Sequence, residues 1–321
     1  MAHTTKIPPT KGLQPRARSR ARKRPPSGGT RPWWLPAVAV LAVVGIGVPA
    51  AYVALRDDGA SIVETTAGLP DTPDYHSLLV SPDDPNAVAL GTHVGLHRSA
   101  DGGRTWRKAE LGGNDAMNLA QPTADTVWAA GHLVLAKSTD GGATWQDVRP
   151  EGLPSLDLHG FAVDPREPSR LYAAVAGEGL FRSDDGGERF RLVSEEVGAG
   201  VFALAVLPSG TVVAGDLQRR ALVASDDEGA SWKELVQASI SGLAVDPSDP
   251  SHILASGPGV LRSTDGGKTW AQTLELSDGS GPVAFSPSDP LRAYVVGFDR
   301  TLYRSDDGGA SWRPVPKGKE G

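Results

Sequence analysis

The chain is 321 residues long, and its 38 acidic residues outnumber its 32 lysines and arginines, which gives a formal net charge of −6. It contains no cysteine, so disulfides, thiolate catalysis and acylation of an N-terminal cysteine are excluded. The length is sufficient for a hydrophobic core that needs no such cross-links.

The first 32 residues form a basic segment with nine lysines or arginines and no acidic residue. The densest run covers residues 16–24, and proline and serine fill much of the rest. This composition predicts a disordered tail. A basic run can also bind nucleic acid, but the segment that follows favours a cytoplasmic tail beside a membrane.

Residues 33–55 form an apolar segment without a single charge, long enough to span a bilayer as a helix. Trp33, Trp34 and Tyr52 stand near its ends, where aromatic rings suit the membrane interfaces. The basic flank predicts an N-terminus inside and the remainder outside the cytoplasmic membrane, with 33–55 as a single-pass signal anchor. A cleaved signal peptide is the alternative, because small residues around Ala50 offer a cleavage site.

The charge balance changes after this segment. Ten of the 32 basic residues lie at or before Arg56 and all 38 acidic residues follow it, so the remainder carries 22 basic residues and a formal charge of −16. An acidic domain is a poor candidate for binding nucleic acid or anionic lipid. Residues 56–73 are predicted to be a short linker with one possible extra strand at 61–66.

Between residues 74 and 316 the chain repeats the motif Ser-x-Asp-x-Gly-x-Thr/Ser-Trp six times, with 38 to 45 residues between successive central aspartates. A period near 40 residues indicates an array of one supersecondary unit. Phe190 replaces the tryptophan in the third copy. In the fourth copy Glu228 stands directly after the central aspartate, where the other five copies have glycine. The aspartates and closing aromatic residues are Asp101, Asp140, Asp185, Asp227, Asp265, Asp307, Trp106, Trp145, Phe190, Trp232, Trp270 and Trp312.

Each unit contains short apolar runs separated by turns of proline, aspartate and glycine. In the third unit the expected strands are 160–163, 171–175, 180–183 and 189–193. Because no helical periodicity interrupts the six units, we predict an all-β six-bladed β-propeller of four-stranded blades over residues 74–316, followed by a tail at 317–321. The extra strand at 61–66 either supplements the closing blade or packs elsewhere.

The motif aspartates fall in the turn between the third and fourth strands, where a carboxylate accepts hydrogen bonds from turn amides. The adjacent glycines allow positive φ, and the tryptophan is large enough to fill the wedge between blades. Six equivalent copies favour a structural role for these aspartates, because catalysis needs a carboxylate only once or twice.

The motif resembles the Asp-box, or BNR repeat, of sialidases and related propellers. Over residues 61–316 the chain is similar to compact bacterial Asp-box proteins of the WD40/YVTN/BNR-like superfamily, some of which carry a glycosyl-hydrolase label, and to photosystem II assembly factors. The resemblance implies a propeller whose Asp-boxes stabilise the blades and lie away from any active site. It does not by itself imply a reaction.

Functional residues are expected on the face opposite the Asp-boxes, which carries the turns between second and third strands and the connections between blades. Asp115, Asp216 and Asp278 lie on that face. The candidate ligand-binding residues are Asp74, His76, His93, His132, Asp157, His159, Arg219, Arg220, Asp299 and Arg300.

The four histidines of this set, with Asp74 or Asp157 behind them, could form a polar or metal-binding pocket. The ligands would come from separate blades, however, and no short ligand spacing supports them. The sequence therefore favours histidines that cap strands or are simply solvated, and it predicts no metal and no cofactor.

No catalytic residue can be assigned. The resemblance to sialidases would imply an arginine triad, a Tyr–Glu pair, an Asp acid/base and an Arg-Ile-Pro motif, but that motif is absent. Only Tyr75 among the tyrosines of the propeller lies outside a repeated strand position, and nothing selects two carboxylates for another glycosidase mechanism.

We therefore expect a monomeric, membrane-anchored, extracytoplasmic module that binds or assembles a protein or a glycan and does not bind nucleic acid. The alternative is a glycoside hydrolase, exo-sialidase-like or of another kind, that acts on cell-surface or environmental glycans.

Overall fold

The structure, a computed structural model, describes residues 65–109, 111, 115–198 and 200–319. The basic tail 1–32, the apolar segment 33–55 and linker residues 56–64 lie outside the described residues. Within the described part, no helix has the length and apolar character that a membrane span requires.

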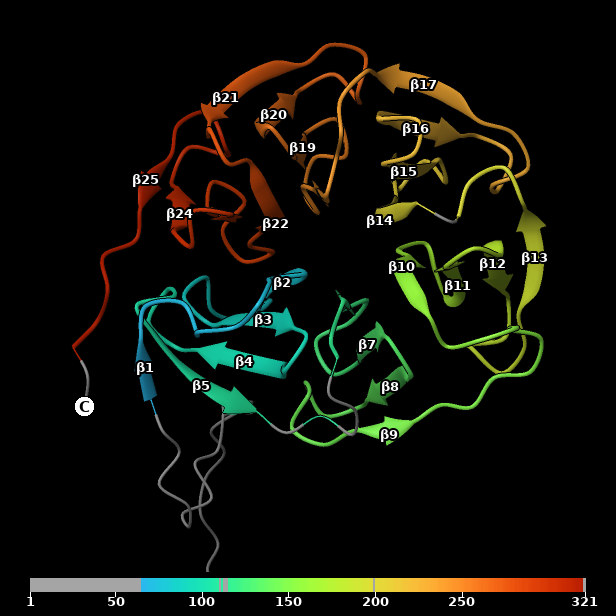
Figure 1. Ribbon diagram of the computed structural model, residues 1–321, viewed down its shortest axis with the longest axis horizontal. Coiled ribbons are helices and arrows are strands. Elements are labelled where there is room, and N and C mark those ends of the chain that lie inside the picture. The colour runs from blue at the N-terminus through green and yellow to red at the C-terminus, as the bar shows by residue number, and fades with distance from the viewer. Residues whose placement is uncertain (1–64, 110, 112–114, 199, 320–321) are drawn as a thin grey trace, which may run out of the picture. The chain divides into compact units, whose positions relative to one another are not determined.

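The described residues form six antiparallel sheets, arranged as blades around a central axis (Figure 1). Blade one contains β1 (Thr65–Ala67), β2 (Ser77–Val80), β3 (Val88–Thr92), β4 (Gly95–Ser99) and β5 (Thr105–Ala109). Blade two contains β6 (Asn118–Ala120), β7 (Val127–Gly131), β8 (Val134–Ser138) and β9 (Gln146–Asp147). Blade three contains β10 (Leu158–Asp164), β11 (Glu167–Val175), β12 (Gly179–Ser183) and β13 (Arg191–Ser194).

The remaining three blades follow the same order. Blade four contains β14 (Val201–Val206), β15 (Val212–Asp216), β16 (Ala221–Ser225) and β17 (Lys233–Val236). Blade five contains β18 (Gly242–Val245), β19 (Ile253–Ser256), β20 (Gly259–Ser263) and β21 (Ala271–Glu275). Blade six contains β22 (Ser280–Phe285), β23 (Ala293–Gly297), β24 (Leu302–Ser305) and β25 (Arg313–Pro314).

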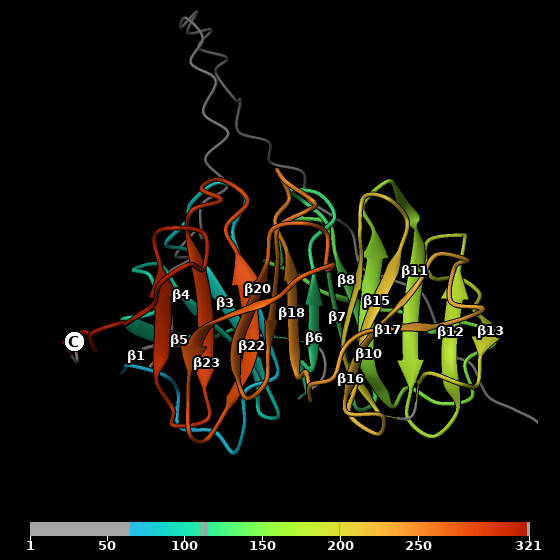
Figure 2. The ribbon, with the colours of Figure 1, turned by 90° about the horizontal axis from the view of Figure 1, so that it is seen from above.

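Apart from β1 in blade one, the strands of each blade pair in chain order from the axis to the rim. They run between two faces of the ring (Figure 2). The prediction of an all-β, six-bladed propeller is confirmed. In blade three the outer strand begins at Arg191, two residues later than expected. The reason is local: the backbone N–H groups of Glu188 and Arg189 donate to the Asp185 carboxylate (3.0 Å each), and that of Phe190 donates to the Glu151 carbonyl (2.8 Å).

The hydrophobic cores lie between neighbouring blades. Tyr172 and Leu180 of blade three pack with Val212 of blade four, and Trp128 of blade two packs with Leu171 of blade three. Inner strands such as β7, β12 and β15 are therefore buried along their whole length. Each fully buried aliphatic side chain contributes about 1.5–3 kcal/mol to stability, so the wedges between blades hold the ring together.

The ring closes by packing between blades one and six. Tyr294 and Leu302 of blade six share a hydrophobic core with Leu90 and Trp106 of blade one. The Tyr294 hydroxyl also donates to the Pro85 carbonyl at 2.9 Å. Blade six is built from the four consecutive strands β22 to β25. Among the described residues, no strand from the start of the chain therefore completes this last blade.

The strand β1 lies at the rim of blade one, where Thr66 pairs with Trp106 of β5. At its described residues, the segment 61–66 thus extends the first blade and does not supplement the closing one. The C-terminal residues reach the same blade, because the Gly318 N–H donates to the Arg104 carbonyl at 2.8 Å.

The Asp-box turns share a face with the turns between first and second strands. In blade one, Asp101 accepts hydrogen bonds from the Thr105 N–H (2.9 Å) and hydroxyl (2.7 Å), and Ser99 Oγ accepts one from the Gly103 N–H (2.8 Å). The Gly102 N–H donates to the Asn86 carbonyl at 2.8 Å, which joins the two turns. Hydrogen bonds from the serine or threonine four residues on lower the pKa to about 2 for Asp140, Asp227, Asp265 and Asp307.

Candidate functional site

The face opposite the Asp-box turns carries a continuous row of histidine and aspartate side chains from the first three blades. We call it the His–Asp row. Its members are Asp74, His76, His93, Asp115, His132, Asp157 and His159.

Two segments of the repeat supply these residues. The connection that enters the innermost strand supplies Asp74 and His76 in blade one, and the turn between second and third strands supplies His93. In blades one and two this turn pairs with the entering connection of the next blade. The Ala116 N–H donates to the Thr92 carbonyl at 3.2 Å, and in the opposite direction the Leu133 N–H donates to the Leu156 carbonyl at 2.8 Å. This pairing brings residues from three blades side by side.

At one end of the row, Asp74, His76 and His93 converge. His93 Nδ1 lies 2.5 Å from His76 Nε2 and 2.7 Å from Asp74 Oδ1. His76 Nε2 lies 3.1 Å from the same carboxylate oxygen. The three atoms are therefore mutual neighbours, and we call this group the first triad.

At the other end, His132, Asp157 and His159 form a second triad. His132 Nε2 lies 3.1 Å from Asp157 Oδ1 and 3.2 Å from His159 Nε2. His159 Nε2 lies 3.2 Å from Asp157 Oδ1. The three atoms form a nearly equilateral triangle.

Asp115 joins the two triads. Its Oδ2 lies 2.5 Å from His132 Nδ1 and 3.8 Å from His93 Nε2. The Asp115 side chain is only 8% exposed, whereas those of His93 and His132 are 40% and 39% exposed. The second oxygen, Oδ1, is buried without a hydrogen-bond partner among the described residues.

Asp115 was expected on this face but not among the candidate ligand-binding residues. A signal for it does exist in the sequence. Blades one and three enter their first strand with Asp-x-His, Asp74 to His76 and Asp157 to His159, and blade two has Asp115 and Met117 at the same two positions. The methionine hides the Asp-x-His pattern in blade two.

Burial lowers the pKa of His76 and of His159, although the neighbouring carboxylates act in the opposite direction. Both imidazoles are therefore neutral near pH 7, and a neutral imidazole keeps one nitrogen lone pair.

Three groups of the row have ligand atoms that all lie within 4.8 Å of one another and could hold a metal ion: the two triads and the central set of His93, Asp115 and His132. The sequence favoured histidines that cap strands or are simply solvated, and the prediction of no metal stays a prediction. The structure adds that hydrogen bonding between adjacent blades brings the four histidines next to aspartates and to one another, which no short spacing in the sequence shows.

Arg219 and Arg300 lie outside the row and have partners of their own. Arg219 Nη2 lies 2.6 Å from Glu196 Oε1. Arg300 pairs with Asp71 and donates to the Thr72 carbonyl at 3.2 Å.

The other candidates on this face also lie apart from the row. Asp299 accepts hydrogen bonds from the Thr301 N–H (3.0 Å) and the Tyr303 hydroxyl (2.8 Å). Arg220 is exposed and has a left-handed backbone with φ 55°. The Tyr75 hydroxyl donates to the Pro70 carbonyl at 2.8 Å in a buried position, which gives this tyrosine a structural role.

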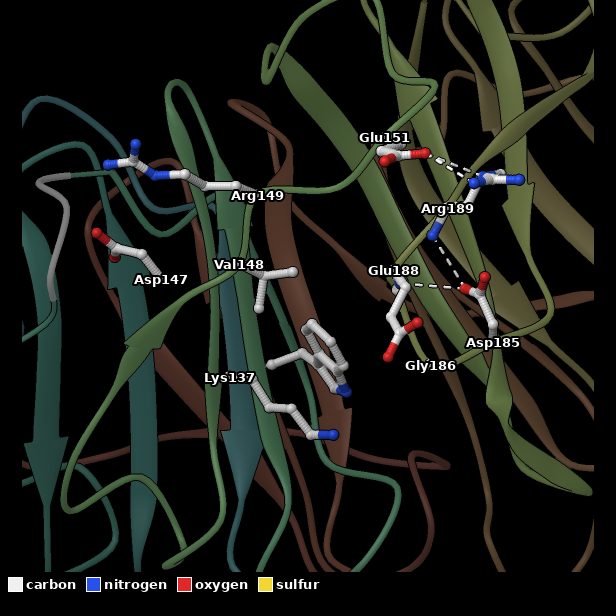
Figure 3. Close-up of a pocket in the computed structure, with 11 residues that line it drawn as sticks. Lys137, Asp147, Val148, Arg149, Glu151, Asp185, Gly186, Glu188 and Arg189 are labelled. Atoms are coloured by element: carbon white, nitrogen blue, oxygen red, sulfur yellow. Dashed lines mark hydrogen bonds and ion pairs between the residues drawn. The ribbon is translucent and has the colours of Figure 1, made fainter.

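A separate pocket of about 510 Å³ lies between blades two and three, beside the Asp-box that ends in Phe190 (Figure 3). Arg189 and Glu151 form an ion pair of 2.8 Å in its wall. Lys137 lies over the Trp128 ring, 5.1 Å from its centre. None of the residues that line this pocket belongs to the His–Asp row.

Comparisons with known proteins agree with the fold. Residues 261–272 match the family model described as BNR/Asp-box repeat, and no curated protein sequence matches the chain. Similar solved structures include the GH74 xyloglucanase from Xanthomonas campestris, at 20% identity and TM-score 0.56, covering 79% of this chain and 47% of that one. The GH74 enzyme from Niastella koreensis has 18% identity, TM-score 0.53 and coverages of 74% and 46%.

A third structure, YCF48 bound to D1 peptide, has 18% identity and TM-score 0.51, and it covers 79% of this chain and 84% of that one. This chain thus spans slightly less than half the length of the two GH74 enzymes. At such identities the likeness concerns the fold alone. The described residues thus form a six-bladed β-propeller, and one of its repeats matches the BNR/Asp-box family model.

Proposed function

We propose that this chain is a binding or assembly module, held outside the cytoplasmic membrane, whose ligand docks on the face that carries the His–Asp row. The observation that carries the proposal is the difference between the two faces. The Asp-box face consists of near-identical structural turns, whereas the opposite face differs from blade to blade and gathers partly exposed polar side chains on three adjacent blades. Loops on a rigid scaffold are the usual place for binding residues.

Exposed apolar side chains beside the row support a protein as the ligand. Leu133 directly follows His132 and is 87% exposed, and Val94 directly follows His93 and is also exposed. Leu133 has φ 61°, a conformation that costs a bulky L-residue roughly 1–3 kcal/mol. A strained, exposed leucine at the tip of a turn is more consistent with a protein contact than with a solvated loop.

The similar fold of YCF48, solved bound to D1 peptide, supports a peptide or protein ligand for a propeller of this length. A glycan is the other ligand class that the fold admits, as the GH74 xyloglucanase illustrates. Placement outside the cytoplasmic membrane rests on the apolar segment 33–55 and the basic tail before it.

The test is co-purification of the full chain from solubilised membranes, with matched variants on the two faces. Leu133→Asp should lose a stoichiometric protein partner, because it places a charge in the apolar contact. Leu291→Asp is the control, since Leu291 is 60% exposed on the turn between first and second strands, on the Asp-box face.

Retention of the partner by Leu133→Asp would contradict the proposal. Turnover of a chromogenic glycoside by the full chain, abolished by a single carboxylate substitution in the row, would favour the glycoside hydrolase alternative instead.

A further inference from the structure

We propose that the His–Asp row binds two divalent transition-metal ions, one in each triad, and that the buried carboxylate of Asp115 between them orients the two central histidines. Metal binding of this kind is independent of the partner proposed above and is measured without it.

The second triad has the spacing of a tetrahedral metal site. Ligand atoms at ~2.0–2.1 Å from a tetrahedral Zn²⁺ lie about 3.3 Å from one another. His132 Nε2, Asp157 Oδ1 and His159 Nε2 are separated by 3.1, 3.2 and 3.2 Å. They occupy three corners of such a site, and partial exposure of His132 and Asp157 leaves access for the ion and for a fourth ligand.

The first triad offers the same donors, two imidazole nitrogens and one carboxylate oxygen. Its atoms lie 2.5, 2.7 and 3.1 Å apart, so His76 and His93 would separate by somewhat less than 1 Å to hold the same ion. His93 is on a turn and is 40% exposed, which leaves its ring room for this shift.

The central set does not compete with the two triads, because a neutral imidazole has one lone-pair nitrogen and one N–H. His132 Nδ1 lies 2.5 Å from Asp115 Oδ2, and His93 Nε2 lies 3.8 Å from the same atom. Asp115 Oδ2 therefore selects the N–H form at His132 Nδ1, and it would select the same form at His93 Nε2 only after the ring shift described above, because 3.8 Å exceeds a hydrogen bond. The lone pairs of His93 Nδ1 and His132 Nε2 then point to the first and second triads.

A carboxylate behind a metal-bound histidine is the usual support for such ligands. Here one buried carboxylate would support a histidine in each of two sites. Two divalent ions would also set four positive charges against the three carboxylates of the row, Asp74, Asp115 and Asp157. The charge density around the buried Asp115 would then be largely neutralised.

The donor set indicates the class of ion. Imidazole nitrogens with carboxylate oxygens suit Zn²⁺ and its neighbours Co²⁺, Ni²⁺ and Cu²⁺, whereas Ca²⁺ and Mg²⁺ require mainly oxygen ligands. With three protein ligands per site, the open fourth position would accept water or an anionic group of a docked ligand.

The test measures Zn²⁺ bound per full-length chain after treatment with a chelator, by elemental analysis and by titration against a chromogenic zinc chelator. The wild type should bind about two ions. His76→Ala and His159→Ala should each bind about one, and the double variant none. Co²⁺ should give the visible absorption of a tetrahedral site and lose half of that signal in each single variant.

The Zn²⁺ affinity of Asp115→Asn tests whether Asp115 positions the histidines, because loss of a merely structural residue would leave that affinity unchanged in a folded protein. Both ions should still bind, but each roughly 10–100-fold more weakly, because the amide no longer fixes the two histidine tautomers. His252→Gln is the matched control, because His252 is also paired with an aspartate, Asp246 at 3.3 Å, but belongs to another blade. This variant should bind Zn²⁺ as the wild type does.

Thermal unfolding followed by circular dichroism checks that each variant is folded, and Asp157→Asn replaces His159→Ala should the latter fail to fold. Three results would overturn the proposal: no Zn²⁺ bound by the wild type at micromolar concentration, unchanged stoichiometry in the folded triad variants, or a single ion that is lost in Asp115→Asn. The last result would mean that the metal lies in the central set.

Discussion

At the scale of the residue, Glu228 shows how one substitution in a repeated turn changes the contact between blades. Its φ of 63° falls where five other copies have glycine, at 69° to 77°. In blade five an arginine of the third strand donates a hydrogen bond to a backbone carbonyl in the Asp-box of the next blade: Arg262 Nε lies 2.9 Å from the Gly308 carbonyl oxygen. In blade four the Glu228 carboxylate pairs instead with Arg182 and Arg170 of blade three.

Two substitutions separate the free-energy cost of the left-handed backbone from the contribution of the ion pair. Glu228→Ala loses the ion pair and keeps the left-handed conformation, whereas Glu228→Gly loses the ion pair but removes the steric strain. We expect the glycine variant to be more stable than the alanine variant by about 1–2 kcal/mol. Urea unfolding measures both, and equal stabilities would show that the backbone at this turn relaxes without cost.

At the scale of the element, the Asp-box turn ties the stability of each blade to the ionisation of one carboxylate. Hydrogen bonds hold the pKa of Asp140, Asp227, Asp265 and Asp307 at about 2, below the ordinary aspartate value. A depressed pKa stabilises the fold at pH values above the unfolded pKa, and that stabilisation is lost as pH falls toward the folded pKa.

The midpoint of thermal unfolding should therefore fall steeply between about pH 4 and pH 2 (from the ordinary aspartate pKa to the lowered one). Asp265→Asn should have a lower midpoint than the wild type at about pH 6 and a shallower decline in acid, because one linked proton is gone. A variant that is as stable as the wild type near neutral pH, with an equally steep decline, would contradict the link between this turn and stability.

At the scale of the whole molecule, the ring of blades could be predicted and the site only in part. Copies of one motif about 40 residues apart specify the number of blades, and six equivalent aspartates specify turns. The sequence also placed His132 and His159 on one face. It could not show that they touch, because their contact depends on the pairing of one blade's turn with the next blade's connection, as between Leu133 and Leu156.

No covalent connection joins the first and last blades, so closure of the ring depends on their shared core, the Tyr294–Pro85 hydrogen bond and the hydrogen bond of Gly318, near the C-terminus, to Arg104. Leu302 of blade six is buried in the core that these blades share, and Leu180 has the equivalent strand position in the core between blades three and four. Leu302→Ala and Leu180→Ala should each destabilise the fold by about 2–5 kcal/mol. The two substitutions should differ in which strands become more mobile.

Blades three and four remain joined by the chain when their core weakens, whereas blades six and one can separate. In Leu302→Ala we therefore expect β2 and β22 to exchange their amide hydrogens about 30-fold faster or more, with little change in β10 and β14. In Leu180→Ala no such local increase at the seam is expected. Hydrogen exchange followed by mass spectrometry under native conditions distinguishes the two, and uniform acceleration in Leu302→Ala would mean that the ring opens only by global unfolding.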